Sequence, residues 1–105
     1  MTSHILYTKT MIGNKVRELR EEKNILLRQL APHLEMDTAI LSKMERGDRS
    51  FRKKDIIHIS KLFDQPEEEL LILWLADKVL KNIAKEKYQK EALTLAINAI
   101  NNKDK

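Results

Sequence analysis

Apolar residues recur every three or four positions along most of this 105-residue chain. Ile12, Val16 and Leu19 show this spacing in the first half of the chain. It places apolar side chains on one face of an α-helix. The chain contains two Gly and two Pro, and no segment alternates apolar and polar residues clearly enough to indicate a strand. The sequence therefore predicts an all-α fold.

Residues that typically begin or end helices divide the chain into six predicted helices. Asp37 is a good N-cap, and Gly47 suits the left-handed position that ends a helix. Pro32 lies inside the second helix, where we expect a kink. Ser50 is a candidate N-cap for the fourth helix, and Pro66 fits the first position of the fifth. The helices are expected at about residues 11–23, 27–34, 38–46, 52–63, 66–83 and 87–101.

Basic residues are concentrated in the first half of the chain. Residues 1–54 hold 12 Lys or Arg against 7 Asp or Glu, whereas residues 55–105 hold 8 against 9, and the whole chain carries a net charge of +4. All six Arg lie in the first half. Guanidinium groups suit phosphates and guanine edges, so this half is the candidate contact surface, although a charge excess of this size is also typical of a solvated face.

Several classes of protein are not expected from this sequence. The absence of Cys excludes disulfides and thiolate metal sites. The longest apolar run covers residues 70–76 and is too short to span a membrane, and residues 1–11 show no secretory signal, so we expect a cytoplasmic protein. His33 and His58 have no partners at metal-ligand spacing. No nucleophile with a base, phosphate-binding loop or carboxylate pair is visible, so we expect no enzymatic activity, metal, cofactor or small-molecule ligand.

The sequence resembles the lambda-repressor-like family, also called the XRE or Cro-type family, over about residues 12–72. The resemblance rests on IGNKVRELREEKN followed by LRQLAPHLEMDTAILSKMERG, with short matches in the family's order and spacing. It implies a five-helix helix-turn-helix domain that binds double-stranded DNA, with an extra C-terminal helix. Residues 1–11 would be an N-terminal arm and residues 73–105 a dimerisation extension. The tail also looks like that of small bacterial regulators, including those associated with restriction-modification systems, and phage-type regulators are a related expectation.

By this resemblance, the third helix enters the major groove and its outer face meets the bases. The implied base contacts are Thr38, Ala39, Ile40, Ser42 and Lys43. Ile40 can meet a thymine methyl group or can simply be buried, whereas Leu41 and Met44 belong to the core. The implied phosphate contacts are Arg28, Arg46, Arg49, Arg52, Lys53 and Lys54.

Some positions depart from the family pattern, and one matches it. Leu26 and Leu27 stand where a capping Ser or Thr and a Gln are usual, so Arg28 is expected to substitute in contacting DNA. Glu35 replaces the Gly of the turn, which implies a left-handed conformation or a different turn. Glu45 should pair with Arg20 by analogy with the family.

The predicted fifth helix is apolar on all sides between residues 70 and 76, which a small domain cannot cover by itself. The apolar stripe of the sixth helix adds to this surface. We therefore expect a homodimer on a palindromic operator, with an interface formed by Leu73, Leu75, Val79, Ile83, Leu93, Ile97 and Ile100. Alternatively, the sixth helix folds back over the fifth within one monomer.

Two functions remain open from the sequence. The first is a sequence-specific transcriptional regulator. The second is an antitoxin or adaptor whose C-terminal helices bind another protein. We also expect residues 1–10 to be dispensable for folding, because they show no periodic apolar face.

Overall fold

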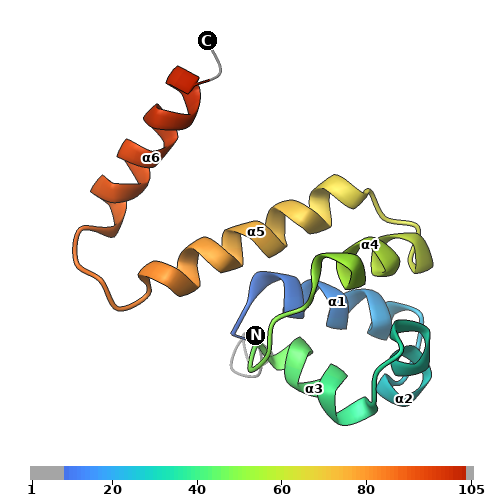
Figure 1. Ribbon diagram of the computed structural model, residues 1–105. Coiled ribbons are helices and arrows are strands. Elements are labelled where there is room, and N and C mark those ends of the chain that lie inside the picture. Colours follow the sequence, from blue (N-terminus) through green and yellow to red (C-terminus); the bar gives the residue numbers. More distant parts are fainter. Residues whose placement is uncertain (1–8, 104–105) are drawn as a thin grey trace.

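In the computed structural model, residues 9–103 are described, and they form six α-helices and one 3₁₀ helix. These are α1 (Met11–Glu22), α2 (Leu27–Leu30), η2 (Ala31–Leu34), α3 (Thr38–Arg46), α4 (Lys53–Leu62), α5 (Glu67–Ile83) and α6 (Gln89–Lys103). The described residues contain no strand, so the all-α prediction is confirmed. Figure 1 shows α1 to α4 gathered together, α5 lying along α1 and α4, and α6 pointing away from them.

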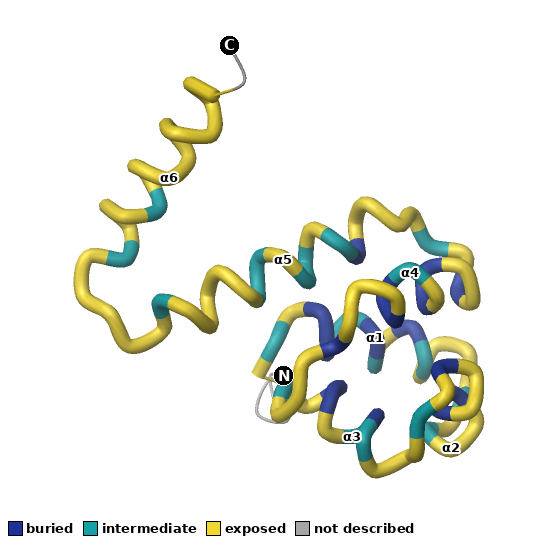
Figure 2. The backbone as a smooth tube through the Cα atoms, in the orientation of Figure 1, coloured by how far each residue is buried: buried dark blue, intermediate teal, exposed yellow. Residues whose placement is uncertain are grey.

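The hydrophobic core lies between α1, α2, α3, α4 and the first half of α5. Each helix contributes apolar side chains at the spacing seen in the sequence, so burial follows one face of each helix (Figure 2). The buried apolar residues are Ile12, Val16, Leu19, Leu30, Ala31, Leu34, Leu41, Met44, Phe51, Ile56, Ile59, Phe63 and Leu70.

Pro32 changes the helix type rather than kinking a single helix. The α-helix α2 ends at Leu30, and the chain continues as the 3₁₀ helix η2 with Pro32 in its first turn. Proline has no amide to complete an α-helical hydrogen bond, so the change of pattern at this residue has a direct cause. Glu35 then adopts the left-handed conformation with φ of 54°, which is the first of the two possibilities that the missing Gly left open.

The expected N-cap of α4 was wrong. Ser50 lies outside the helix, which begins at Lys53 after the N-cap residue Arg52. The backbone amide of Arg52 donates to Oδ2 of Asp55 at 3.0 Å, so a carboxylate in the first turn of the helix makes the capping contact with the N-cap residue. Pro66 is the N-cap residue of α5 instead of its first helical residue.

Lys9 and Thr10, which the sequence assigned to the N-terminal arm, make hydrogen bonds to α1 and to the end of α3. Thr10 is the N-cap of α1, and its hydroxyl accepts from the amide of Gly13 at 3.0 Å. The Lys9 amide donates to the carbonyl of Arg46 at 2.9 Å. These two contacts argue against the prediction that residues 1–10 are dispensable for folding as far as Lys9 and Thr10 are concerned. Residues 1–8 lie outside the described residues.

α5 is tied to the start of α1 beyond residue 72. The two carboxylate oxygens of Asp77 accept from the amides of Met11 and Ile12, each at 2.9 Å. The first amides of a helix have no partner within the helix and carry a partial positive charge, so a carboxylate satisfies both needs there. Consequently α5 holds the domain together over a longer stretch than its buried residue Leu70 alone would suggest.

Candidate nucleic-acid interface

α3 is fixed from its inner side. Leu41 and Met44 are buried in the core, as predicted. Gly13 of α1 lies so close to the end of α3 that an added Cβ would overlap the carbonyl oxygen of Glu45, so a glycine is needed at this contact. The position of α3 on the domain is therefore set by close backbone approach as well as by apolar packing.

The predicted pairing of Glu45 with Arg20 is confirmed. Nε and Nη2 of Arg20 donate to the two carboxylate oxygens of Glu45 at 2.9 and 3.0 Å, and Nη1 donates to the carbonyl of Ile25 at 2.9 Å. Both side chains are largely buried. The hydrogen bond with Glu45 raises the pKa of Arg20 above its ordinary value against the opposing effect of burial, so the guanidinium stays charged. This pair joins α1 to the end of α3.

The two ends of α3 are also defined by its own residues. Oδ1 of Asp37 accepts from the amide of Ile40 at 2.8 Å, and Gly47 ends the helix with φ of 84°. Both capping predictions are confirmed. A helix anchored at both ends and along its inner face presents its outer side chains in a fixed arrangement.

The outer face of α3 carries most of the predicted base-contact residues. Thr38, Ala39 and Lys43 are exposed, and Ser42 is partly exposed. Ile40 is half buried and packs against the core, which agrees in part with the alternative that it is a core residue. Thr38, Ala39 and Lys43 are thus the side chains most accessible to base edges.

Ser42 and Arg46 belong to a small polar network at the end of α3. Nη1 of Arg46 donates to the hydroxyl of Ser42 at 3.2 Å, and its Nε donates to Asp48 at 3.2 Å. Lys9 also pairs with Asp48, at 2.6 Å. The hydrogen bond from Lys9, followed by that from Arg46, lowers the pKa of Asp48. A phosphate that binds Arg46 would compete with Asp48 for its guanidinium.

Arg52 differs from the other predicted phosphate contacts. Its Nε and Nη2 donate to the two oxygens of the buried Asp55 at 3.0 and 2.9 Å. The hydrogen bond with Asp55 raises the pKa of Arg52. The buried carboxylate of Asp55 needs a cationic partner, so the guanidinium of Arg52 stays paired with it at the start of α4. Arg28, Arg49, Lys53 and Lys54 are exposed, and within residues 9–103 they have no hydrogen-bond or ion-pair partner.

The start of α2 uses a residue that the sequence reading missed. Leu26 is the N-cap residue and has no polar side chain, but Oε1 of Gln29 accepts from its amide at 2.7 Å. A Gln three residues after the cap position is a recognisable signal for this contact. This contact occupies Oε1 of Gln29, whereas Arg28 is exposed and has no hydrogen-bond or ion-pair partner within residues 9–103.

The predicted dimer residues lie mostly on surfaces that the single chain leaves uncovered. Leu75 and Val79 of α5 and Ile97 and Ile100 of α6 are exposed, with exposed fractions between 43% and 60%. Ile83 and Leu93 are partly exposed. Leu73 is half buried against the monomer core, so it offers less surface than expected. Ile72, which the sequence reading left out, is 63% exposed on the same side of α5 as Leu75 and Val79.

Other kinds of site receive no support in the part of the chain that the structure describes. Residues 9–103 contain no group of three or more His, Asp or Glu placed to hold a metal ion. His33 and His58 are both exposed. Within the same residues, no helix has the length and apolar character needed to cross a bilayer.

Helices α2 and η2 lead through a left-handed turn into the capped helix α3, which has an exposed polar face. This arrangement defines a helix-turn-helix module. A family model described as helix-turn-helix matches residues 16–70, more than half of the chain. The chain belongs to this lambda-repressor-like helix-turn-helix family of DNA-binding regulators, as its motifs indicated. Comparisons with curated proteins and with solved structures found no match.

Proposed function

We propose that this protein is a transcriptional regulator that recognises a palindromic operator as a homodimer. The observation that carries the proposal is the outer face of α3, where Thr38, Ala39 and Lys43 are exposed on a helix that is fixed from behind. Lys43 can donate to guanine O6 or N7, Thr38 to either kind of base edge, and the methyl group of Ala39 can contact thymine.

The charged residues around α3 support the same function. Four exposed cations have no hydrogen-bond or ion-pair partner within the described residues. They are Arg28 at the start of α2, Arg49 in the connector between α3 and α4 (residues 47–52), and Lys53 and Lys54 at the start of α4. Cations of this kind bind phosphates and position a reading helix without selecting a sequence. Arg46 contributes by exchanging Asp48 for a phosphate.

The exposed apolar surfaces of α5 and α6 favour a dimer. A single helix-turn-helix domain covers too little DNA for tight specific binding, and a twofold dimer doubles the contact. Leu75 and Val79 on α5 and the α6 stripe of Leu93, Ile97 and Ile100 supply apolar area that water otherwise contacts. The same surface also favours a second candidate function, that of an antitoxin or adaptor whose α5 and α6 hold a different protein.

Selection of DNA from a random duplex pool, followed by sequencing, tests the proposal. The full chain, purified without DNA, is expected to enrich one inverted repeat and to sediment as a homodimer. Enrichment of no sequence above the starting pool would contradict the proposal. Recovery mainly in a stoichiometric complex with a different chain, with no enriched sequence, would favour the adaptor function.

A further inference from the structure

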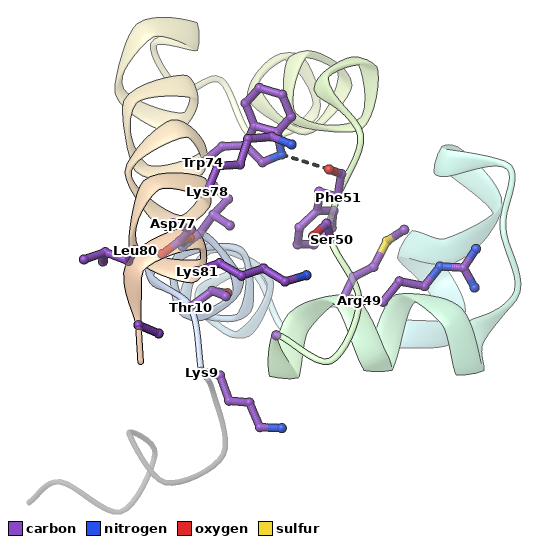
Figure 3. A pocket seen from close by; sticks show the side chains of 14 residues that line it. Lys9, Thr10, Arg49, Ser50, Phe51, Trp74, Asp77, Lys78, Leu80 and Lys81 are labelled. Atoms are coloured by element: carbon purple, nitrogen blue, oxygen red, sulfur yellow. Dashed lines mark hydrogen bonds between the residues drawn. The ribbon is translucent and has the colours of Figure 1, made fainter. Parts of the chain in front are cut away.

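A cavity of about 370 Å³ lies between the connector that follows α3 and the second half of α5. Its walls include Phe51 of the connector, Met44 of α3 and Trp74, Leu80 and Ala84 on the α5 side. Nε1 of Trp74 donates to the carbonyl of Phe51 at 2.8 Å, which holds the two aromatic residues together at one end of the cavity (Figure 3). Cavities of this size with mostly apolar walls are typical of small-molecule sites.

The charged residues around this cavity are strongly unbalanced. Lys9, Arg49, Lys78 and Lys81 line it, and Asp77 is the one acidic side chain among its lining residues. Asp77 is already bound by the two amides at the start of α1. Its single negative charge offsets one of the four cations, so the lining residues keep an excess of positive charge.

Two of the four cations are partly engaged and two are free. Lys9 pairs with Asp48 outside the cavity, and Lys78 lies over the Trp74 ring with Nζ 4.4 Å from its centroid. Arg49 and Lys81 have no hydrogen-bond or ion-pair partner among residues 9–103. Figure 3 shows Lys81 reaching from α5 toward the connector that carries Arg49. In the same view the side chain of Arg49 extends away from Lys81, so Lys81 is the unpaired cation that reaches across the cavity.

We propose that this cavity binds a small organic anion that has an aromatic body and one carboxylate or sulfonate group. The aromatic body would pack on Phe51 and Trp74, and the anionic group would bind the ammonium group of Lys81. Apolar walls with a few placed polar groups bind the body by burial and fix its orientation by charge. The class of ligand follows from the combination of apolar walls and unpaired cations. A neutral apolar molecule would leave the cations unpaired, and a simple inorganic anion would leave the apolar walls in contact with water.

The site also has a regulatory consequence, which rests on the proposed function. Arg49 is a predicted phosphate contact and at the same time lines the cavity. The negative charge of an anion in the cavity lowers the positive potential around this connector, so the ligand lowers the affinity for DNA. Leu75 and Val79 lie on a different face of α5 from Trp74 and Lys81, so the occupied cavity leaves the predicted dimer surface open.

Titration of the full chain with anilinonaphthalene sulfonate tests the binding site. This probe combines aromatic rings with a sulfonate and becomes fluorescent on apolar surfaces. Saturable binding is expected with one probe per chain. Lys81→Glu should weaken the affinity about fivefold or more, because an attractive charge becomes repulsive, whereas Lys81→Arg should bind nearly as the wild type does.

Lys90→Glu on α6 is the matched control, since it changes the net charge equally and lies outside the cavity. Equal affinity of the Lys81→Glu and Lys90→Glu variants would overturn the proposal. The double variant Leu93→Asp/Ile97→Asp removes the apolar stripe of α6, and loss of the probe signal in it would place binding on α6 and also overturn the proposal.

Naphthalene carboxylate and naphthalene carboxamide then separate charge from shape. The carboxylate should displace the probe and the uncharged amide should displace it at least about fivefold less well; equal displacement would contradict an anion site. In DNA-binding assays, the carboxylate should weaken binding by the wild type more than by the Lys81→Glu variant. A protein that binds the probe in this way but binds no DNA would refute the proposed function while leaving the cavity site intact.

Discussion

At the scale of single residues, the position of α3 depends on one buried ion pair. Arg20 and Glu45 satisfy each other through two hydrogen bonds, and the third bond of Arg20 holds the carbonyl of Ile25 before α2. Since the hydrogen bond with Glu45 raises the folded-state pKa of Arg20, its stabilising contribution is fully present below the pKa of the unfolded state and is lost only as the pH rises through the folded-state pKa. The Arg20 guanidinium therefore stays charged at every pH used for DNA binding.

We predict that Glu45→Ala lowers the free energy of unfolding by about 3–5 kcal/mol, because it leaves the Arg20 guanidinium buried and unpaired. Chemical denaturation followed by circular dichroism measures this. Glu21→Ala, which removes the partner of an exposed pair with Arg17, is the control and should cost less than about 1 kcal/mol. Similar losses in the two variants would mean that the buried pair does not hold α3 in place.

Lys43 should read a base, whereas Lys54 should contact the backbone. We predict that Lys43→Ala reduces the preference at one position of the site by about 1–3 kcal/mol, because the side chain is exposed on the groove face of α3. Lys54→Ala is the matched change in a residue outside α3, and it should weaken binding to all sequences about equally. Competition binding with single-base operator variants measures both. An unchanged base preference in the Lys43 variant would mean that α3 is docked differently.

At the scale of helices, the sequence predicted the elements whose signals are local. Asp37 and Gly47 mark the ends of α3 in the sequence and mark them in the structure, because each acts on residues three or four positions away. Arg52 and Asp55 cap α4 through a contact that is equally local, but Ser50 is the more usual capping residue and misled the prediction. The contact of Asp77 with Met11 could not be read from the sequence, because it depends on how α5 crosses α1.

We predict that Asp77→Ala destabilises the domain by about 1–2 kcal/mol, since it leaves two amides of α1 without their acceptor and removes a negative charge from the helix N-terminus. Thermal unfolding of the full chain measures the effect. Glu86→Ala, in the exposed segment after α5, is the control and should change stability by less than about 0.5 kcal/mol. Equal melting temperatures of the two variants would show that α5 does not fix the start of α1.

At the scale of the whole molecule, α6 is the part that a single chain leaves without a partner. It extends away from the other helices and none of its residues is buried (Figure 2). The alternative in which it folds back over α5 does not describe this structure. The sequence predicted the apolar stripe of α6, but its direction relative to α5 depends on the segment around Tyr88, whose left-handed conformation with φ of 67° carries no sequence signal comparable to Gly.

We predict that Leu93→Asp/Ile97→Asp converts a dimer into a folded monomer with weaker DNA binding, because it places charges in an apolar contact. Leu95→Asp/Asn102→Asp introduces the same number of acidic groups on the opposite side of α6 and should remain a dimer. Sedimentation velocity gives the mass of each. A stable dimer in the first variant would place the interface away from α6.

The arrangement of two α3 helices on one DNA duplex can be measured directly, because the chain contains no Cys. Ala39→Cys places a single thiol on the outer face of α3, and an iron chelate attached there cleaves the DNA that lies beside it. Lys90→Cys on α6 provides the control for cleavage from elsewhere on the protein. On the selected operator, we predict that Ala39→Cys gives two centres of cleavage about 10 base pairs apart, one for each α3 in successive major grooves. A single centre, or cleavage no stronger than that from Lys90→Cys, would contradict recognition of an operator by paired α3 helices.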